Sequence, residues 1–214
     1  METTDNMSSR LYHIYRTFWK HDYTVTAADK TPLYFADNSI WTPKKPDLTV
    51  HEGTNDKTPI VASVKFLRFS RYCKVGLGDP NDVKNATWED LHAEGYSHGK
   101  YNWQMLLHKD GAPNRYSFVW KHTSSVGVGD TRPSKFSTDN FKLVDEQTQQ
   151  VLAAYTTSNH KSVEKAGKLE IYPDYGRDFE LMTIVTILTI VERHRRRNQT
   201  RTAAASGGGA GGAG

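Results

Sequence analysis

The side chains that most often bind metals or act as nucleophiles are spread along this sequence rather than grouped. Its nine histidines form neither a His-Glu-x-x-His motif nor a zinc-type spacing, and a single cysteine excludes a thiolate cluster. Residues 79–90 have the acidic offsets of a calcium loop, but Val83 and Lys84 stand where an oxygen ligand and the turn glycine are required. The sequence therefore predicts no catalytic residues, no metal site and no cofactor.

The lone Cys73 and the glycine pairs have ordinary structural interpretations. A single cysteine cannot form an internal disulfide, which suits a reducing compartment, and we interpret Cys73 as a buried structural thiol rather than a nucleophile. The paired glycines at 76–78 and 127–129 lack the third glycine and the strand-to-helix setting of a phosphate-binding loop, so they are expected to be turns. With no Gly-x-Ser-x-Gly motif either, an enzyme is not indicated.

Basic side chains gather in two places, and these are the candidate sites for an anionic lipid or other anion. In the first, alternation along one strand would send Lys65 and Arg71 to one side and Arg68 and Lys74 to the other, and the alternative is a solvated barrel exterior. The second follows an apolar run and suits acidic lipid headgroups, at about 1 kcal/mol per side chain, or a solubilising helix end, or a nuclear-localisation signal. The candidates are Lys65, Arg68, Arg71, Lys74, Arg193, Arg195, Arg196 and Arg197.

The charge of the chain is uneven along its length. The 214 residues contain 28 lysines and arginines and 24 acidic residues, a net charge of +4. Residues 193–214 hold five of the arginines and no acid, so 23 basic residues face 24 acidic ones in the rest, which carries a net charge of −1. A nucleic-acid-binding domain normally spreads positive charge over a face of the fold, so nucleic acid is an unexpected partner.

Short aromatic and β-branched runs, separated by turn residues, extend over residues 10–172. This pattern is typical of antiparallel sheets, and no helical pattern alternates with the runs, which disfavours a parallel sheet. Residues 124–139 are expected to form a long loop. The expected strands are 11–18, 23–27, 33–36, 48–51, 60–69, 72–77, 86–93, 103–108, 116–122, 141–144, 151–157 and 169–172.

Residues 179–191 differ from the rest of the chain because they are almost continuously apolar. Their β-branched content favours a strand by propensity, but the run exceeds ordinary strand length, Asp178 is a good N-cap, and arginines follow where a helix would end. The run of 13 residues is shorter than the roughly 20 that a membrane-spanning helix needs. We therefore expect a helix near 178–197 and no transmembrane span.

Such a helix has no polar face, so protein must surround it, and in a mostly β chain the surround is a barrel wall. Thr183, Thr186 and Thr189 interrupt the apolar run. Threonine hydroxyls can donate to backbone carbonyls one turn back, so these side chains are also expected to be buried.

A β-rich body closed by an all-apolar helix resembles the tubby C-terminal-like superfamily, which includes the LURP-one-related proteins and phospholipid scramblases. The likeness is to small fungal members and covers most of residues 10–198. It is carried by the segments 116–121 (YSFVWK), 141–145 (FKLVD), 151–155 (VLAAY) and 181–197. The resemblance implies a mainly β (α+β) fold, an antiparallel barrel of about twelve strands around a hydrophobic C-terminal helix. It also implies phosphoinositide binding.

The domain organisation and setting follow from these observations. Residues 10–198 are expected to form one domain, with a flexible N-terminus at 1–9 that lacks a signal-peptide pattern and a disordered Ala/Gly-rich tail at 199–214. We expect a cytoplasmic protein, peripheral at a membrane, with the nucleus as an alternative location. The predicted function is non-catalytic binding of an anionic lipid or a protein partner; the alternative is scramblase-like lipid transport with the helix inserted in the membrane.

Overall fold

Twelve antiparallel strands form a closed barrel in the part of the chain that the structure, a computed structural model, describes: residues 9–39, 42, 45–95, 99–108, 112–133, 137–157 and 165–207. Each strand pairs with its neighbours along the chain, and β12 closes the barrel by pairing with β1. One helix, α1 (Arg177–Gly207), follows within this part of the chain. The strands are β1 (Arg10–Arg16), β2 (Tyr23–Ala27), β3 (Pro32–Asn38), β4 (Leu48–Glu52), β5 (Ile60–Phe66), β6 (Tyr72–Leu77), β7 (Thr87–Glu94), β8 (Lys100–Leu107), β9 (Asn114–His122), β10 (Phe141–Asp145), β11 (Val151–Thr157) and β12 (Lys165–Ile171).

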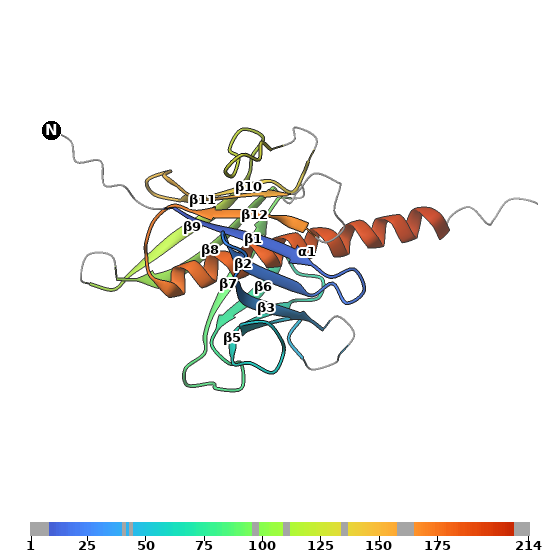
Figure 1. Cartoon of the computed structure of the whole chain (residues 1–214), viewed down its shortest axis with the longest axis horizontal. Coiled ribbons are helices and arrows are strands. Elements are labelled where there is room, and N and C mark those ends of the chain that lie inside the picture. Colours follow the sequence, from blue (N-terminus) through green and yellow to red (C-terminus); the bar gives the residue numbers. More distant parts are fainter. Residues whose placement is uncertain are drawn as a thin grey trace, which may run out of the picture.

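The apolar run of α1 lies inside this barrel, as the sequence predicted. Figure 1 shows the helix passing through the ring of strands, with its C-terminal turns projecting beyond them. Every residue from Leu181 to Ile190 is buried, so no side of these turns faces water. Each fully buried aliphatic side chain contributes about 1.5–3 kcal/mol, which makes the helix the centre of the core. The barrel around a hydrophobic C-terminal helix is confirmed.

Alternation along the strands supplies the rest of the core. In β8, Tyr101, Trp103, Met105 and Leu107 are buried while the residues between them face outward. The rings of Trp103, Phe118 and Phe179 pack together, with the centroids of Phe118 and Phe179 5.3 Å apart. Aromatic side chains from the wall therefore fill the space between the strands and the first turn of α1.

Two of the three threonines in the apolar run satisfy their hydroxyls as expected. Thr189 Oγ1 donates to the carbonyl of Val185 at 2.7 Å, and Thr186 Oγ1 donates to the carbonyl of Thr183 at 3.1 Å. Thr186 also accepts a hydrogen bond from Trp120 Nε1 at 3.0 Å, which joins the helix to the wall. Thr183 departs from the expectation, because its buried hydroxyl has no hydrogen-bond partner.

Both ends of α1 differ from the predicted 178–197. The helix begins at Arg177, one residue early, so Asp178 lies in the first turn rather than at the cap; Gly176, with φ 87°, precedes the helix. It continues to Gly207, into the segment predicted to be disordered from 199, because Thr200 and Thr202 donate to carbonyls one turn back and three alanines follow. Residues 1–8 and 208–214 of the predicted termini lie outside the described residues.

All twelve predicted strands are present; β2, β6 and β11 have the predicted ends, and the other nine differ at one or both ends. β5 stops at Phe66 rather than at residue 69, because residues 67–71 form a turn in which Phe69 has φ 55°. β8 starts at Lys100 rather than at residue 103. Lys100 and Asn102 alternate with buried residues and face outward, so they add no apolar signal to the start of the strand.

Candidate functional site

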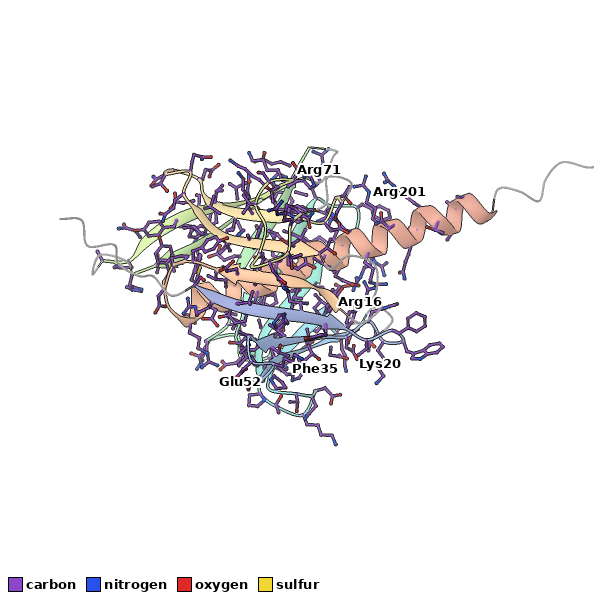
Figure 2. The ribbon with its side chains drawn as sticks, turned by 45° about the horizontal axis from the view of Figure 1, so that its top comes forward. Arg16, Lys20, Phe35, Glu52, Arg71 and Arg201 are labelled. Carbon is purple, nitrogen blue, oxygen red and sulfur yellow. The ribbon has the colours of Figure 1, made fainter. Side chains whose placement is uncertain are left out.

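The last turns of α1 leave the barrel at one end, which we call the helix-exit rim. It comprises the β1–β2 turn (residues 17–22), the β5–β6 turn (residues 67–71) and α1 residues 193–201. Arg193 fixes the helix to the second turn by donating from Nη2 to the carbonyl of Ser70 at 2.7 Å and from Nη1 to that of Arg71 at 3.0 Å. Figure 2 shows Arg16, Lys20 and Arg201 on the side to which the helix projects.

Buried Glu192 forms ion pairs with two of the arginines that the sequence offered as lipid ligands. Its carboxylate accepts hydrogen bonds from Arg195 Nε and Nη2 at 2.7 and 2.6 Å, from Arg196 Nε at 2.6 Å and from Tyr23 Oη at 2.8 Å. Burial alone would raise the pKa of Glu192, but hydrogen bonds from Arg195, Asn38 and Arg196 outweigh it and lower this pKa to about 2. Arg195 and Arg196 are therefore parts of an internal ion-pair network.

Arg196 extends the network to the barrel wall. Its Nη1 donates to Asp47 Oδ1 at 2.7 Å and its Nη2 to Asn38 Oδ1 at 3.1 Å, while the guanidinium lies 4.5 Å from the ring centroid of Phe66. Asp47 Oδ2 in turn accepts from the backbone amide of Phe66 at 2.9 Å. The end of the helix is thereby tied to β3 and β5.

The single cysteine takes part in the same anchoring. Arg193 Nη1 lies 3.1 Å from Cys73 Sγ, and Cys73 is fully buried on β6. Burial raises the pKa of this thiol to about 11, against the opposing influence of Arg193. A thiol with that pKa stays protonated at neutral pH, which agrees with the interpretation of Cys73 as a structural residue.

A histidine holds the neighbouring loop to the helix. His194 Nδ1 lies 2.7 Å from Asp139 Oδ1, and His194 Nε2 lies 2.9 Å from Tyr101 Oη. Tyr101 is buried inside the barrel, and burial raises the pKa of its phenol. Asp139, His194 and Tyr101 thus link the loop that precedes β10 to α1 and β8. The hydroxyl of Tyr101 is buried within this link and is not accessible to a substrate.

Five cations at the rim have no such partners. Within the described residues they make no side-chain hydrogen bond or salt bridge, and each is exposed or half-buried. Of the nearby carboxylates, Asp47 and Glu192 bind arginines, while Asp22 is buried and accepts from the backbone amide of Asn38 at 3.0 Å, so one unpaired carboxylate stands against five cations. The rim therefore presents uncompensated positive charge. The five are Arg16, Lys20, Arg68, Arg197 and Arg201.

The structure divides the eight predicted ligands into separate groups. Arg68 and Arg197 belong to the free cations of the rim, Arg71 is exposed beside them, and Arg193, Arg195 and Arg196 are held internally. Lys65 and Lys74 lie opposite each other on the outer wall, because the turn at 67–71 breaks the alternation that was expected to separate them. Lys74 pairs with Asp90 at 2.7 Å, whereas Lys65 is exposed.

A groove of about 530 Å³ runs along the outer wall from β3 to β7, and Lys45 and Lys65 line it. Its floor follows one row of paired residues, Thr49, Ser63, Gly76 and Trp88. The indole of Trp88 lies over Gly76, and the hydroxyl of Ser63 is buried without a hydrogen-bond partner. Two ammonium groups, two carboxylates and an aromatic face thus line one open groove; of the carboxylates, Asp37 accepts a hydrogen bond from Ser39 Oγ at 2.8 Å, and Asp56 lies in the β4–β5 turn at the other end of the barrel. The other lining residues are Asp37, Pro46, His51, Asp56, Ile60, Pro80 and Asn81.

Two other kinds of site are absent from the described residues. No helix there combines the length and apolar character needed to cross a membrane. No group of three or more His, Cys, Asp or Glu side chains there is arranged to hold a metal ion.

Comparison with known proteins places the architecture but not the activity. This chain is similar to a solved X-ray structure of a protein from Arabidopsis thaliana. The match covers 87% of this chain and 93% of the Arabidopsis chain, with a TM-score of 0.51 and 11% sequence identity. The likeness shows the fold. No protein-family model matches the sequence, and no curated protein matches it.

Sequence reasoning missed Arg16 and Lys20, which flank the β1–β2 turn. They are separated in sequence from the two basic groups, and only closure of the barrel brings this turn to the end where α1 leaves. One signal was available, since Phe18 and Trp19 stand next to each other within the β1–β2 turn, where polar residues are usual.

Proposed function

We propose that this chain is a non-catalytic module that binds anionic membrane surfaces through the helix-exit rim. The observation that carries the proposal is the imbalance of charge there: Arg16, Lys20, Arg68, Arg197 and Arg201 are unpaired, while the nearby carboxylates are engaged internally. Each cation near an anionic bilayer contributes about 1 kcal/mol, so five of them acting together give useful affinity at moderate salt.

The internal network explains why this charge stays outside the barrel. Glu192 and Asp47 bind the inward-facing guanidinium groups, so the remaining arginines have no acidic partner to draw them in. The same network holds α1 against the wall, and the projecting turns carry the exposed Arg201 away from the barrel (Figure 2). A rigid cationic end suits binding to a flat anionic surface better than binding to a deep pocket.

The outer groove is the proposed place for a phosphorylated headgroup. Lys45 and Lys65 lie close to the rim, since the hydrogen bond between Asp47 and Phe66 joins their strand ends. Their ammonium groups can bind phosphate as point charges. If the chain belongs to the tubby C-terminal-like superfamily, as we propose, this groove is where it would bind a phosphoinositide. Lys65→Glu should then remove any preference for phosphoinositide over phosphatidylserine.

The scramblase-like alternative is less well supported by the geometry. It requires the apolar turns of α1 to enter a bilayer, but these turns are buried inside the barrel. Withdrawing them would expose the aromatic core and break the hydrogen bond between Trp120 and Thr186. Peripheral binding needs no such rearrangement.

Co-sedimentation with vesicles tests the proposal. The purified chain is mixed with vesicles of phosphatidylcholine alone, of phosphatidylcholine with phosphatidylserine, and of phosphatidylcholine with a phosphoinositide, at low and at moderate salt. We expect binding to both anionic compositions, weakened as salt screens the rim, and none to phosphatidylcholine alone. Equal behaviour with neutral and anionic vesicles at low salt would show that the rim is a solvated surface only.

A further inference from the structure

Large apolar side chains are exposed at the same rim as the free cations. Trp19 is 88% exposed and Phe18 59% exposed at the β1–β2 turn, and Phe69 is fully exposed beside the partly exposed Leu67 at the β5–β6 turn. Soluble surfaces scatter such residues singly, whereas here four of them occupy two turns at one end of the barrel. We call Phe18, Trp19, Leu67 and Phe69 the apolar tips.

The fold holds the second tip outward. Phe69 has φ 55°, a left-handed conformation that aromatic residues rarely adopt. The next two carbonyls, of Ser70 and Arg71, accept hydrogen bonds from Arg193 of α1. The helix therefore fixes this strained turn in the conformation that points Leu67 and Phe69 away from the barrel.

The first tip combines an apolar ring pair with nearby cations. Phe18 and Trp19 pack edge to face, with ring centroids 5.2 Å apart. A hollow of about 590 Å³ beside them is lined by Arg16 and Lys30, together with threonines of β2. Lys30 is at the far end of β2, so Arg16 and Lys20 are the cations next to the rings. Rings beside cations match a phospholipid, which has apolar chains next to an anionic phosphate.

We propose that the two apolar tips enter the interfacial layer of an anionic bilayer, with the rim cations at the level of the lipid phosphates. This inference rests on the proposed function and adds a second, salt-insensitive source of affinity. Charge complementarity selects the occupant: a protein partner with an apolar pocket would not need five unpaired cations around the tips, while an anionic bilayer offers both chemistries together.

Serine substitutions separate the two sources of affinity. Phe18→Ser with Trp19→Ser, and separately Leu67→Ser with Phe69→Ser, should each weaken partitioning into phosphatidylcholine–phosphatidylserine vesicles about tenfold, and binding at moderate salt should suffer most. The matched control is Val83→Ser with Leu106→Ser, two exposed apolar residues at the opposite end of the barrel, which should bind within about twofold of the parent. Thermal unfolding confirms that each variant is folded.

Depth of insertion is measured by quenching of tryptophan fluorescence with lipids that carry a nitroxide near the headgroup. The parent chain should be quenched on binding, and Trp19→Phe should bind equally well but lose most of the quenching. Insertion would be overturned if the tip variants bind like the parent, or if the fluorescence of the bound parent is not quenched. In either case, salt-dependent binding to anionic vesicles would still support the proposed function. A parent chain that ignores anionic vesicles would overturn the proposed function and insertion together.

Discussion

The hydroxyl of Tyr23 donates to Oε2 of Glu192 at 2.8 Å, inside the end of the barrel where α1 leaves. It is part of a network that also holds Arg195 and Arg196, two partly buried cations that Glu192 and Asp47 compensate together. We expect Glu192→Gln to lower the free energy of unfolding by about 3 kcal/mol, because it leaves Arg195 without a carboxylate partner and Arg196 with Asp47 alone. Denaturant unfolding measures the loss. Asp130→Asn, which removes an exposed partner of Lys168, is the control and should change stability little.

The same carboxylate predicts how stability depends on pH. The pKa of Glu192 is lowered from 4.5 to about 2 in the folded chain, so its contribution is complete above about pH 4.5 and is lost as pH falls towards 2. Denaturant unfolding at a series of pH values should show a decline across this window that is shallower in Glu192→Gln. An identical decline in both chains would mean that other carboxylates control acid unfolding.

Two threonines one turn apart on α1 should respond oppositely to replacement by valine. Thr186→Val removes the acceptor of the buried Trp120 indole N–H and should cost about 1–3 kcal/mol. Thr183→Val removes a buried hydroxyl that has no hydrogen-bond partner, so it should be neutral or stabilising. Both substitutions replace threonine by valine in the same helix, so they change side-chain size and helix propensity equally. Equal losses in the free energy of unfolding would show that the hydrogen bond from Trp120 Nε1 to Thr186 does not stabilise the fold.

Two glycines make room for aromatic rings on opposite faces of the wall. A Cβ atom at Gly167 would lie 2.6 Å from the ring of Tyr155 inside the barrel, and one at Gly76 would lie 2.9 Å from the ring of Trp88 outside it. Gly167→Ala should cost about 1–3 kcal/mol or more, because buried Tyr155 cannot move away. Gly76→Ala should cost less and should shift tryptophan emission to longer wavelength, since partly exposed Trp88 can swing into water. Equal stability losses would contradict this account.

The fold was predictable because two kinds of apolar pattern are unambiguous in this chain. The run from Leu181 to Val191 has no polar face, so protein must surround it on every side. The rest of the chain consists of short strands separated by turn residues, and such strands can surround a helix only as the wall of a barrel. The ends of the elements were less predictable. Outward-facing residues such as Lys100 and Asn102 carry no apolar signal, and the alanines after Thr202 continue a helix that the sequence predicted to end near residue 197.

The candidate site was predictable only in part. Glu192 precedes Arg195 and Arg196 by three and four residues, a helical spacing from which the ion pairs could have been predicted but were not. The partners Asp47 and Tyr23 come from strands far away in sequence, and barrel closure is what places them there. The rim itself is a property of the closed barrel.

Charge reversal at the two ends of the barrel tests the central claim most directly. Arg68→Glu with Arg197→Glu changes the rim, and Lys57→Glu with Lys84→Glu makes the same change in net charge among exposed residues at the opposite end. Co-sedimentation with phosphatidylcholine–phosphatidylserine vesicles should show a loss of about tenfold or more for the first variant and a change within about twofold for the second. Equal losses for the two variants, or no loss for the first, would contradict an oriented membrane contact through the helix-exit rim.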